Sequence, residues 1–207
     1  MNIGICGGTF DPFHRGHLDP ILAVRDAMQW ERVIYIPAFV QPFKAGRDTA
    51  SPFHRFAMTV VATEEHDSLF VSPRELERGE ISYSVDTLRE LRDEHPDATL
   101  DWIIGDDNLD RLHEWKSIET IATLANFVVL TRNRDRANDF RAPGFQNVTA
   151  TERQKAGSLV FAENATVPIS STEIRKRLRD GESIEELVPP PVSRYIHHYG
   201  LYRKAHS

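Results

Sequence analysis

The residues best suited to chemistry lie near the N-terminus, between Gly7 and Leu18. This segment reads Gly-Gly-Thr-Phe-Asp-Pro-Phe-His-Arg-Gly-His-Leu, with histidines at positions 14 and 17. Glycines, which lack a Cβ, let a phosphate approach backbone N–H groups, and imidazoles donate hydrogen bonds to phosphate oxygens whose charge grows during transfer. The residue types and spacing predict a phosphate-handling site in which both imidazoles converge on one pocket.

A helix is expected to follow this segment. Apolar residues recur at helical spacing at Leu18, Ile21, Val24 and Met28. Pro20 lacks an N–H and is tolerated within about the first turn, so it places the helix start close by and His17 near the N-terminus. There, unpaired N–H groups and the helix dipole favour a bound anion.

Other interpretations of the same residues stay open. A Gly-Gly pair after a strand is also typical of a tight turn before a helix, and two histidines three residues apart can form a surface pair or part of a metal site. A zinc site would need further ligands, and the only cysteine is Cys6. The chain contains neither Gly-x-Gly-x-x-Gly nor Gly-Lys-Ser/Thr, so neither a dinucleotide fingerprint nor a P-loop is indicated.

A second cluster, Ile-Ser-Ser-Thr-Glu-Ile-Arg, occupies residues 169–175. Ser170 and Glu173 have the spacing of a capping box, and Gly181 is a suitable C-terminal stop, so a short helix is expected to begin here.

The start of that helix is another candidate anion site. Ser171 and Thr172 can offer backbone N–H groups and hydroxyls to a phosphate, and Arg175 can add a forked cationic donor one turn later. Taken alone, the cluster is more typical of an ordinary helix cap with a solvated arginine than of an anion site.

Strand and helix signals alternate along the chain. Short apolar runs predict strands at residues 3–6, 33–36, 69–71, 100–104, 127–130 and 158–162. Ser51 and Pro52 are expected to open a helix with an apolar face of Phe53, Phe56, Ala57, Val60 and Val61. Ser84 is expected to cap another helix, which carries Val85, Leu88 and Leu91. Residues 131–157 are rich in charge, Asn, Pro and Gly, and predict a loop or insertion.

This alternation predicts an α/β fold, a Rossmann-like doubly wound parallel sheet with helices on both faces. In an open parallel sheet, ligands bind beyond the carboxyl ends of the strands, so both clusters should face the same crevice.

Composition bounds the rest. The 207 residues, 40% of them hydrophobic and 27% charged, suit one domain over residues 1–207, with a C-terminal helical part of about 170–207 packed on it. A formal charge of -6 argues against a nucleic-acid or anionic-membrane partner but allows a small anionic ligand. A single cysteine excludes an internal disulfide, and no signal peptide or spanning segment is evident, so a cytoplasmic location is expected. The oligomeric state is left open, and a homo-oligomer is compatible with the sequence.

Together the motifs resemble those of the bacterial nicotinate-nucleotide adenylyltransferases. That family belongs to a nucleotidyltransferase superfamily marked by His-x-Gly-His, here residues 14–17, and by Ile-Ser-Ser-Thr-x-Ile-Arg, here residues 169–175. Residues 81–88 resemble its Ser-Tyr-Thr segment, and Ile-Gly-Asp-Asp at 104–107 with Trp115 resembles its Ile-Gly-x-Asp and downstream tryptophan. Residues 181–202 follow its closing pattern, so the likeness runs nearly end to end.

The resemblance implies adenylyl transfer from ATP to nicotinate mononucleotide, giving nicotinate adenine dinucleotide and pyrophosphate in NAD biosynthesis. Mg²⁺ would accompany ATP, with no dedicated metal site on the protein. The implied catalytic residues are His14, His17, Lys44 and Arg175. The implied ATP contacts are Gly7, Gly8, Thr9, Phe10, Gly105, Asp106, Ile169, Ser171 and Thr172. The implied nicotinate mononucleotide contacts are Ser84, Val85, Trp115 and Lys116.

The physical chemistry of the acceptor residues agrees with this division. An indole face stacks on a flat heteroaromatic ring, and backbone N–H donors suit a carboxylate. A core or lid position for Trp115 is the competing interpretation.

Two departures from the family pattern are present. Gln41-Pro42-Phe43-Lys44 stands where Pro-Pro-His-Lys is common, and Ser84 replaces a threonine, keeping the hydroxyl but losing the methyl that stiffens it. Other functions compatible with the sequence are transfer to nicotinamide mononucleotide, phosphopantetheine or a cytidylyl acceptor, non-catalytic nucleotide binding, and metal-dependent hydrolysis through His14 and His17.

Overall fold

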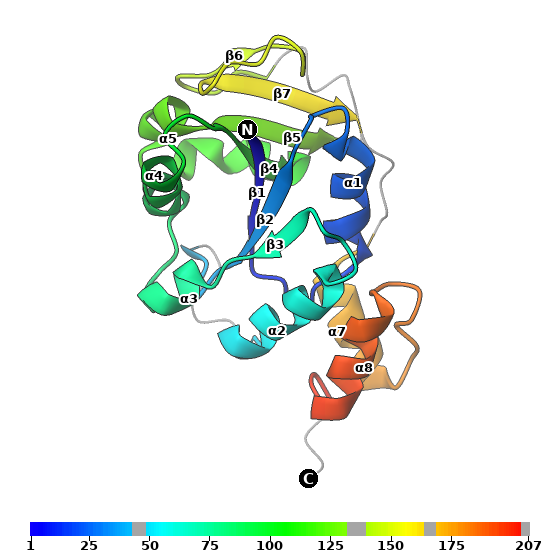
Figure 1. Ribbon diagram of the computed structural model, residues 1–207. Coiled ribbons are helices and arrows are strands. Elements are labelled where there is room, and N and C mark those ends of the chain that lie inside the picture. Colours follow the sequence, from blue (N-terminus) through cyan, green and yellow to red (C-terminus); the bar gives the residue numbers. More distant parts are fainter. Residues whose placement is uncertain (43–48, 132–139, 164–168, 204–207) are drawn as a thin grey trace.

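The computed structural model describes residues 1–42, 49–131, 140–163 and 169–203. They form a seven-stranded parallel sheet in the order β3-β2-β1-β4-β5-β7-β6 (Figure 1). The strands are β1 (Asn2–Gly8), β2 (Arg32–Pro37), β3 (Leu69–Val71), β4 (Thr99–Gly105), β5 (Asn126–Thr131), β6 (Gln146–Asn147) and β7 (Ser158–Glu163). The order reverses direction between β1 and β4, which is the mark of a doubly wound sheet.

Helices cover both faces of the sheet (Figure 1), which confirms the predicted fold class. They are α1 (Arg15–Arg25), α2 (Pro52–Thr63), α3 (Arg74–Arg78), α4 (Ser84–Glu94), the 3₁₀ helix η2 (Asp106–Glu114), α5 (Ile118–Leu124), α7 (Ser171–Asp180) and α8 (Pro190–Tyr199). Within the described ranges, no helix is long and apolar enough to cross a membrane.

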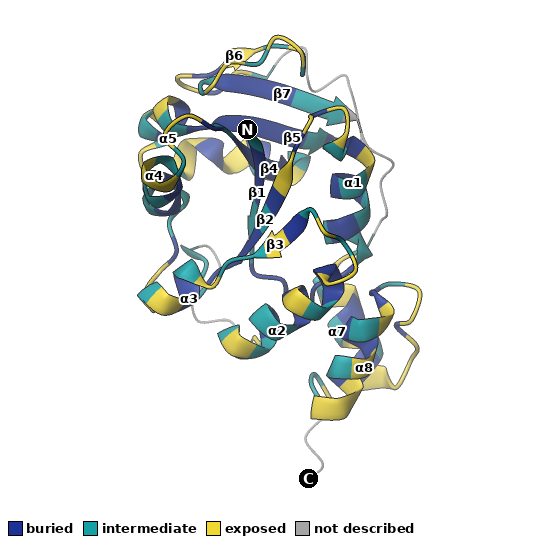
Figure 2. Cartoon of the chain, viewed as in Figure 1, coloured by how far each residue is buried: buried dark blue, intermediate teal, exposed yellow. Residues whose placement is uncertain are grey.

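The continuous apolar runs arise because the strands are buried on both sides. On β5, Phe127 and Val129 join a cluster with α4 and α5, whereas Val128 joins a second cluster with α1 on the opposite face. All three are fully buried, and Figure 2 shows β5 and β7 largely in the buried class. Successive side chains point to opposite faces, so a strand between two helical layers is apolar throughout.

The C-terminal helices share the core of the α1 face. Ile174 and Leu178 from α7 and Val192 and Ile196 from α8 lie in the same hydrophobic cluster as α1. Gly181 ends α7 with a φ of 75°, as its position after the helix predicts.

The start of α1 differs from the prediction in its cause. Pro20 is the sixth residue of the helix and lies inside it, so it does not mark the first turn. Residue 20 has no N–H to offer the carbonyl of Gly16, so one helical bond is missing there. His17 is nevertheless the third helical residue, near the N-terminus as expected, and Met28 lies beyond the helix end at Arg25.

The predicted apolar face of α2 is wrong. Ser51 caps the helix by accepting from the N–H of His54 at 3.2 Å, as expected, but Phe53 is 70% exposed and Val60 is 37% exposed. The buried residues are instead Arg55, Met58, Thr59, Ala62 and Thr63. Threonine hydroxyls are buried here because they donate to carbonyls of the preceding turn.

Two smaller differences concern α4 and the region predicted as a loop. Ser84 is the first residue of α4, and Tyr83 takes the cap position without a side-chain bond. The described residues 140–157 contain the short strand β6 and Arg153, whose side chain enters the core. The remainder of that region, 132–139, lies outside the described residues.

Arg153 completes a buried polar cluster around Asp101. The Asp101 carboxylate is fully buried and accepts from Trp30 Nε1 at 2.7 Å, Asn126 Nδ2 at 2.9 Å and Arg153 Nε at 2.9 Å. Burial raises the pKa of Asp101, and the charge of Arg153 is the largest opposing influence.

Replacing Arg153 tests this cluster. Arg153→Met leaves the buried carboxylate without its cation, so we expect a loss of about 3 kcal/mol in the free energy of unfolding, measured by urea denaturation. Because folding raises the pKa of the Asp101 carboxyl, this group stabilises the folded protein at pH values below its unfolded-state pKa. That stabilisation is lost as the pH rises through the folded-state pKa. Removing Arg153 raises the Asp101 pKa further, so the deficit should be larger near neutrality than at about pH 4.

The matched control is Lys155→Met, because Lys155 makes an exposed ion pair with Asp97 at 3.5 Å. We expect this variant to unfold like the unsubstituted protein. Equal losses for both variants would show that Arg153 acts only as a surface charge.

Candidate active site

The candidate site lies at the carboxyl ends of β1 and β4, the adjacent strands where the sheet order reverses. β1 leads to the segment with the two histidines, and β4 ends at Gly105. Parallel sheets of this type bind ligands beyond this switch point.

Gly7 and Gly8 do not form the predicted turn. They are the last two residues of β1. A Cβ on Gly7 would lie 2.7 Å from Cζ2 of Trp102, and one on Gly8 would lie 2.8 Å from the ring of Phe10. The chain turns at Phe10, with a φ of 51°, so the glycines make room for aromatic rings instead of forming the turn themselves.

The structure brings His14 and His17 together. Their rings stack with centroids 3.7 Å apart and planes at 23°. The backbone N–H of His14 donates to Nδ1 of His17 at 3.2 Å, which places the proton of a neutral His17 ring on Nε2. A Cβ on Gly16 would lie 3.0 Å from Nδ1 of His14, so the glycine between the histidines permits their close approach.

Aromatic side chains pack against the ring of His17. Its ring meets Phe10 edge-on at 5.0 Å and Phe13 at 5.4 Å between centroids. The Tyr35 hydroxyl donates to the carbonyl of His17 at 3.0 Å. This packing fixes the direction of the imidazole before any ligand binds.

Part of the anion-binding capacity predicted for the start of α1 is used within the protein. The N–H of Arg15 donates to the carbonyl of Leu187 at 3.0 Å, and that of His17 donates to the carbonyl of His14 at 2.8 Å. The helix start is therefore anchored to the C-terminal region.

The second motif contacts the first directly. Ser170 accepts from the N–H of Glu173 at 3.2 Å, as a cap should. The Ser171 hydroxyl donates to the carbonyl of Pro12 at 3.2 Å, and Arg175 Nη1 donates to the carbonyl of Asp11 at 2.6 Å. Two segments about 160 residues apart thus form one surface, with Arg175 at its edge.

Asp11 is a site residue that the sequence did not single out. Its carboxylate is 3% exposed and accepts from the N–H of Ala50 at 3.1 Å and from the Tyr202 hydroxyl at 2.6 Å. Arg175 Nη1 lies 3.5 Å from its other oxygen. Burial, followed by the charge of Asp11, raises the pKa of Tyr202, so the phenol stays protonated and donates.

Arg55 is the second residue that sequence reasoning missed. It is 2% exposed, and its guanidinium donates to the carbonyls of Thr9 at 2.7 Å, Phe39 at 3.0 Å and Ala50 at 3.1 Å. Burial lowers the pKa of Arg55, and the charge of Asp11 opposes this. A signal did exist, because Arg55 stands three residues before the buried Met58 on the inner face of α2.

Thr9 is held from two sides. Its carbonyl accepts from Arg55, and its hydroxyl donates to Oε1 of Gln41 at 2.8 Å. Gln41 belongs to the departure from the family pattern noted above. Lys44, the predicted cation of the same loop, lies outside the described residues.

The β4 side contributes Gly105 and Asp106. A Cβ on Gly105 would lie 2.6 Å from Oδ1 of Asp107, so the glycine allows the chain to enter η2 tightly. Thr131 at the end of β5 donates to Oδ2 of Asp106 at 3.5 Å.

Two of the predicted acceptor residues, Ser84 and Val85, open α4, and Lys116 contacts the residues on either side of them. Lys116 Nζ lies 3.1 Å from Oδ2 of Asp86 and 4.3 Å from the ring centroid of Tyr83. Val85 is fully buried, with its backbone included.

Trp115 is half-buried next to Lys116. Its ring meets Phe127 edge-on, with centroids 5.6 Å apart and planes at 88°. This contact holds the ring against the core.

A resident metal has no evident ligand set in the described part of the chain. No group of three or more His, Cys, Asp or Glu residues gathers there. Desolvation raises the pKa of Cys6 to about 12, so its sulfur stays a thiol at neutral pH, whereas metal ligation needs a thiolate.

Comparison with known proteins agrees with this geometry. The family model described as cytidylyltransferase-like matches residues 5–177, which span both motifs, so the chain is a nucleotidyltransferase of this class. A relative from Desulfitobacterium hafniense, named a probable nicotinate-nucleotide adenylyltransferase, is 36% identical over 207 residues, covering 97% of this chain and 95% of its own. A relative of the same name from Aeromonas hydrophila is 37% identical, covering 98% of both chains. The chain belongs to the nicotinate-nucleotide adenylyltransferase family.

Solved structures share the fold. The nicotinic acid mononucleotide adenylyltransferase of Plasmodium falciparum, complexed with NaAD, superposes with a TM-score of 0.70 at 20% identity, covering 97% of both chains. A putative nicotinate-nucleotide adenylyltransferase from Vibrio parahaemolyticus gives a TM-score of 0.68 at 17% identity, covering 99% of this chain and 98% of that one. At these identities the likeness establishes the common architecture.

Replacing Arg55 by lysine tests its hold on the turn after β1. Arg55→Lys keeps the charge but loses the planar fork, so buried carbonyls are left without donors. We expect the free energy of unfolding to fall by about 2 kcal/mol or more, measured by chemical denaturation. Arg111→Lys is the control, since the side chain of Arg111 is 50% exposed and pairs with Glu114 one turn away. An Arg55→Lys variant as stable as Arg111→Lys would contradict the assigned role.

Proposed function

We propose that this protein transfers the adenylyl group of ATP to nicotinate mononucleotide, with release of pyrophosphate and formation of nicotinate adenine dinucleotide. The observation that carries the proposal is the direct contact between the two motif segments, through Ser171 to Pro12 and Arg175 to Asp11. It brings the segment with the stacked imidazoles next to the segment that carries Arg175. The names of the full-length relatives support nicotinate mononucleotide as the acceptor.

The proposed reaction is a direct in-line displacement. A phosphate oxygen of the mononucleotide attacks the α-phosphorus of ATP, and the bond from that phosphorus to the bridging oxygen breaks. The electron pair leaves with pyrophosphate. The attacking oxygen is already ionised, so neither a general base nor a covalent intermediate is needed. Catalysis then consists of alignment and charge stabilisation.

The imidazoles and Arg175 are assigned to the phosphates. His17, with its proton on Nε2, donates to phosphate oxygens, and the ring of His14 stacked on it acts on the same group. Arg175, with its side chain 25% exposed, adds positive charge from α7. Lys44 stays assigned to the phosphates on the strength of the family resemblance.

The remaining ATP contacts are assigned along the carboxyl edge of β1 and β4. Thr9 and Phe10 line the turn after β1, and Gly105 and Asp106 face the adenosine part. The start of α7, with Ile169 before it, completes the nucleotide side through Ser171 and Thr172.

The acceptor is assigned to the start of α4. The hydroxyl of Ser84 and the backbone N–H of Val85 would bind the pyridine carboxylate, and the charge of Lys116 beside them favours an anion. The indole of Trp115 would stack on the ring. These groups favour nicotinate over the neutral amide.

Mg²⁺ is proposed to arrive with ATP as part of the substrate, held by phosphate oxygens and water. A cytoplasmic location and a homo-oligomeric state stay predictions from the sequence.

The role of His17 is testable by substitution. We expect His17→Ala to lower kcat at least about 100-fold, because it removes a preorganised donor to the transition state. Circular dichroism should show an intact fold. His198→Ala, an exposed position on α8, is the control and should keep normal turnover. Near-normal turnover by His17→Ala would remove this residue from the mechanism.

The acceptor is testable by pyrophosphate release with ATP and four parallel arms: nicotinate mononucleotide, nicotinamide mononucleotide, phosphopantetheine and no acceptor. We expect kcat/KM to be at least about tenfold higher with nicotinate mononucleotide than with the amide, since a charge-assisted bond is lost with the amide. A preference for another acceptor would overturn the substrate assignment. Release without acceptor would favour hydrolysis, and no release in any arm would favour a binding protein.

A further inference from the structure

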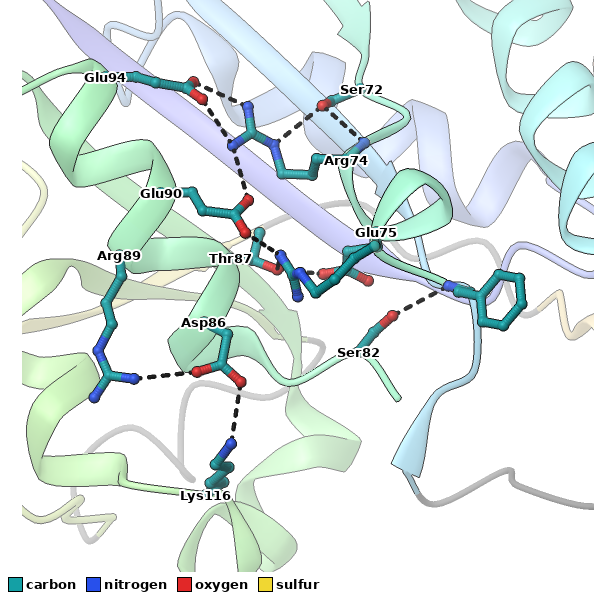
Figure 3. Close-up of polar contacts among 12 residues, drawn as sticks. Ser72, Arg74, Glu75, Ser82, Asp86, Thr87, Arg89, Glu90, Glu94 and Lys116 are labelled. Carbon is teal, nitrogen blue, oxygen red and sulfur yellow. Dashed lines mark hydrogen bonds and ion pairs between the residues drawn. The ribbon is translucent and has the colours of Figure 1, made fainter. Parts of the chain in front are cut away.

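A buried carboxylate lies outside the residues assigned above. Glu75, on α3, is 4% exposed, and its Oε1 accepts from the hydroxyl of Thr87 at 2.6 Å. Thr87 lies in the first half of α4 and is fully buried. Figure 3 shows the two side chains pointing toward each other from the two helices. A buried acid is costly, so its place needs a reason.

The direction of this hydrogen bond is set by a neighbour. Arg78 Nη2 donates to the Thr87 oxygen at 3.3 Å. Since a guanidinium has no acceptor, the Thr87 proton must point toward Glu75. The carboxylate is therefore the acceptor that orients the hydroxyl.

Burial and polar neighbours act on Glu75 in opposite directions. Burial raises its pKa, and this effect is opposed first by the Thr87 hydroxyl, then by the Ser82 hydroxyl and then by the charge of Arg78. Two hydroxyls, one before and one after the first turn of α4, thus act on the same carboxylate.

The segment between these hydroxyls is the one assigned to the acceptor. Ser82 and Thr87 flank Ser84 and Val85. At its near end, Ser82 Oγ accepts from the N–H of Phe39 at 3.1 Å, and the N–H of Ser82 donates to the carbonyl of Val40 at 2.9 Å. The near end is tied to the loop after β2, and the far end is tied to α3 through Glu75.

We propose that Glu75 is a positioning residue for the acceptor, because its bond to Thr87 fixes the turn that presents Ser84 and the Val85 N–H. The inference rests on the proposed function, which places the pyridine carboxylate at that turn. A shift of a few tenths of an ångström in the Ser84 hydroxyl or the Val85 N–H would weaken binding of the pyridine carboxylate. The proposed contacts with ATP would be unaltered.

Glu94 provides a matched contrast. It is the last residue of α4, the helix that carries Thr87, and it pairs with Arg74 of α3 at 3.0 Å (Figure 3). Its side chain is 51% exposed, and within the described part of the chain its hydrogen bonds go to Arg74. It joins the same two helices as Glu75 and Thr87 without a bond to the turn.

The test compares KM for the two substrates in full-length variants. We expect Glu75→Gln and Thr87→Val each to raise KM for nicotinate mononucleotide about tenfold, with KM for ATP within about twofold of the unsubstituted value. Thr87→Ser keeps the hydroxyl and should restore near-normal values. Glu94→Gln should leave both KM values unchanged. Calorimetric titration of nicotinate mononucleotide should show the same order of affinities.

Each outcome decides the matter. Equal increases in both KM values, a change in kcat alone, or no change in Thr87→Val would overturn the positioning role. If Glu75→Gln does not fold, the Thr87 pair carries the test, because valine and threonine are nearly the same size. If the unsubstituted protein does not use nicotinate mononucleotide, the proposed function itself is overturned. That result is distinct from every result of the variant series, because it is measured without any substitution.

Discussion

The guanidinium of Arg55 is the constraint on which the site depends. The chain leaves β1 through a left-handed residue, Phe10, and the sheet no longer supplies hydrogen bonds to the turn. Buried carbonyls need donors, and Arg55 supplies them to three at once, on Thr9, Phe39 and Ala50. Asp11 and the two histidines follow that turn in the chain, and the α7 motif contacts the residues directly after it. A lysine or a water molecule could not reach all three carbonyls in one plane.

Phe39 joins the two halves of the site. Its carbonyl accepts from Arg55 on the side proposed to bind ATP, and its N–H donates to Ser82 on the side proposed to bind the acceptor. The parallel pairing of β1 with β2 sets where this residue falls, because the register places Gly8 opposite Pro37. Two anionic substrates must be aligned accurately for an in-line reaction. A short rigid connection between their proposed binding segments would maintain that alignment.

Sequence patterns predicted what depends on local periodicity and caps. The apolar runs located six of the strands, and Ser51, Ser170 and Gly181 marked helix ends as observed. Patterns failed where polar groups are buried by distant partners. Arg153 is indistinguishable in sequence from a solvated arginine, because its acceptors lie up to 125 residues away. Arg55 differs from one only in its helical spacing from Met58, and its acceptor carbonyls on Thr9 and Phe39 lie 46 and 16 residues away. The glycines at positions 7 and 8 indicated that the chain has no room for a Cβ there. They did not indicate that aromatic rings occupy the space.

The bond between Tyr202 and Asp11 joins residues 191 positions apart. Helices and the pairing of β1 with β2 form from nearby residues, whereas this contact closes a loop of 191 positions and carries a larger entropic cost. This order of costs places the fastening of the segment around His14 and His17 late in folding.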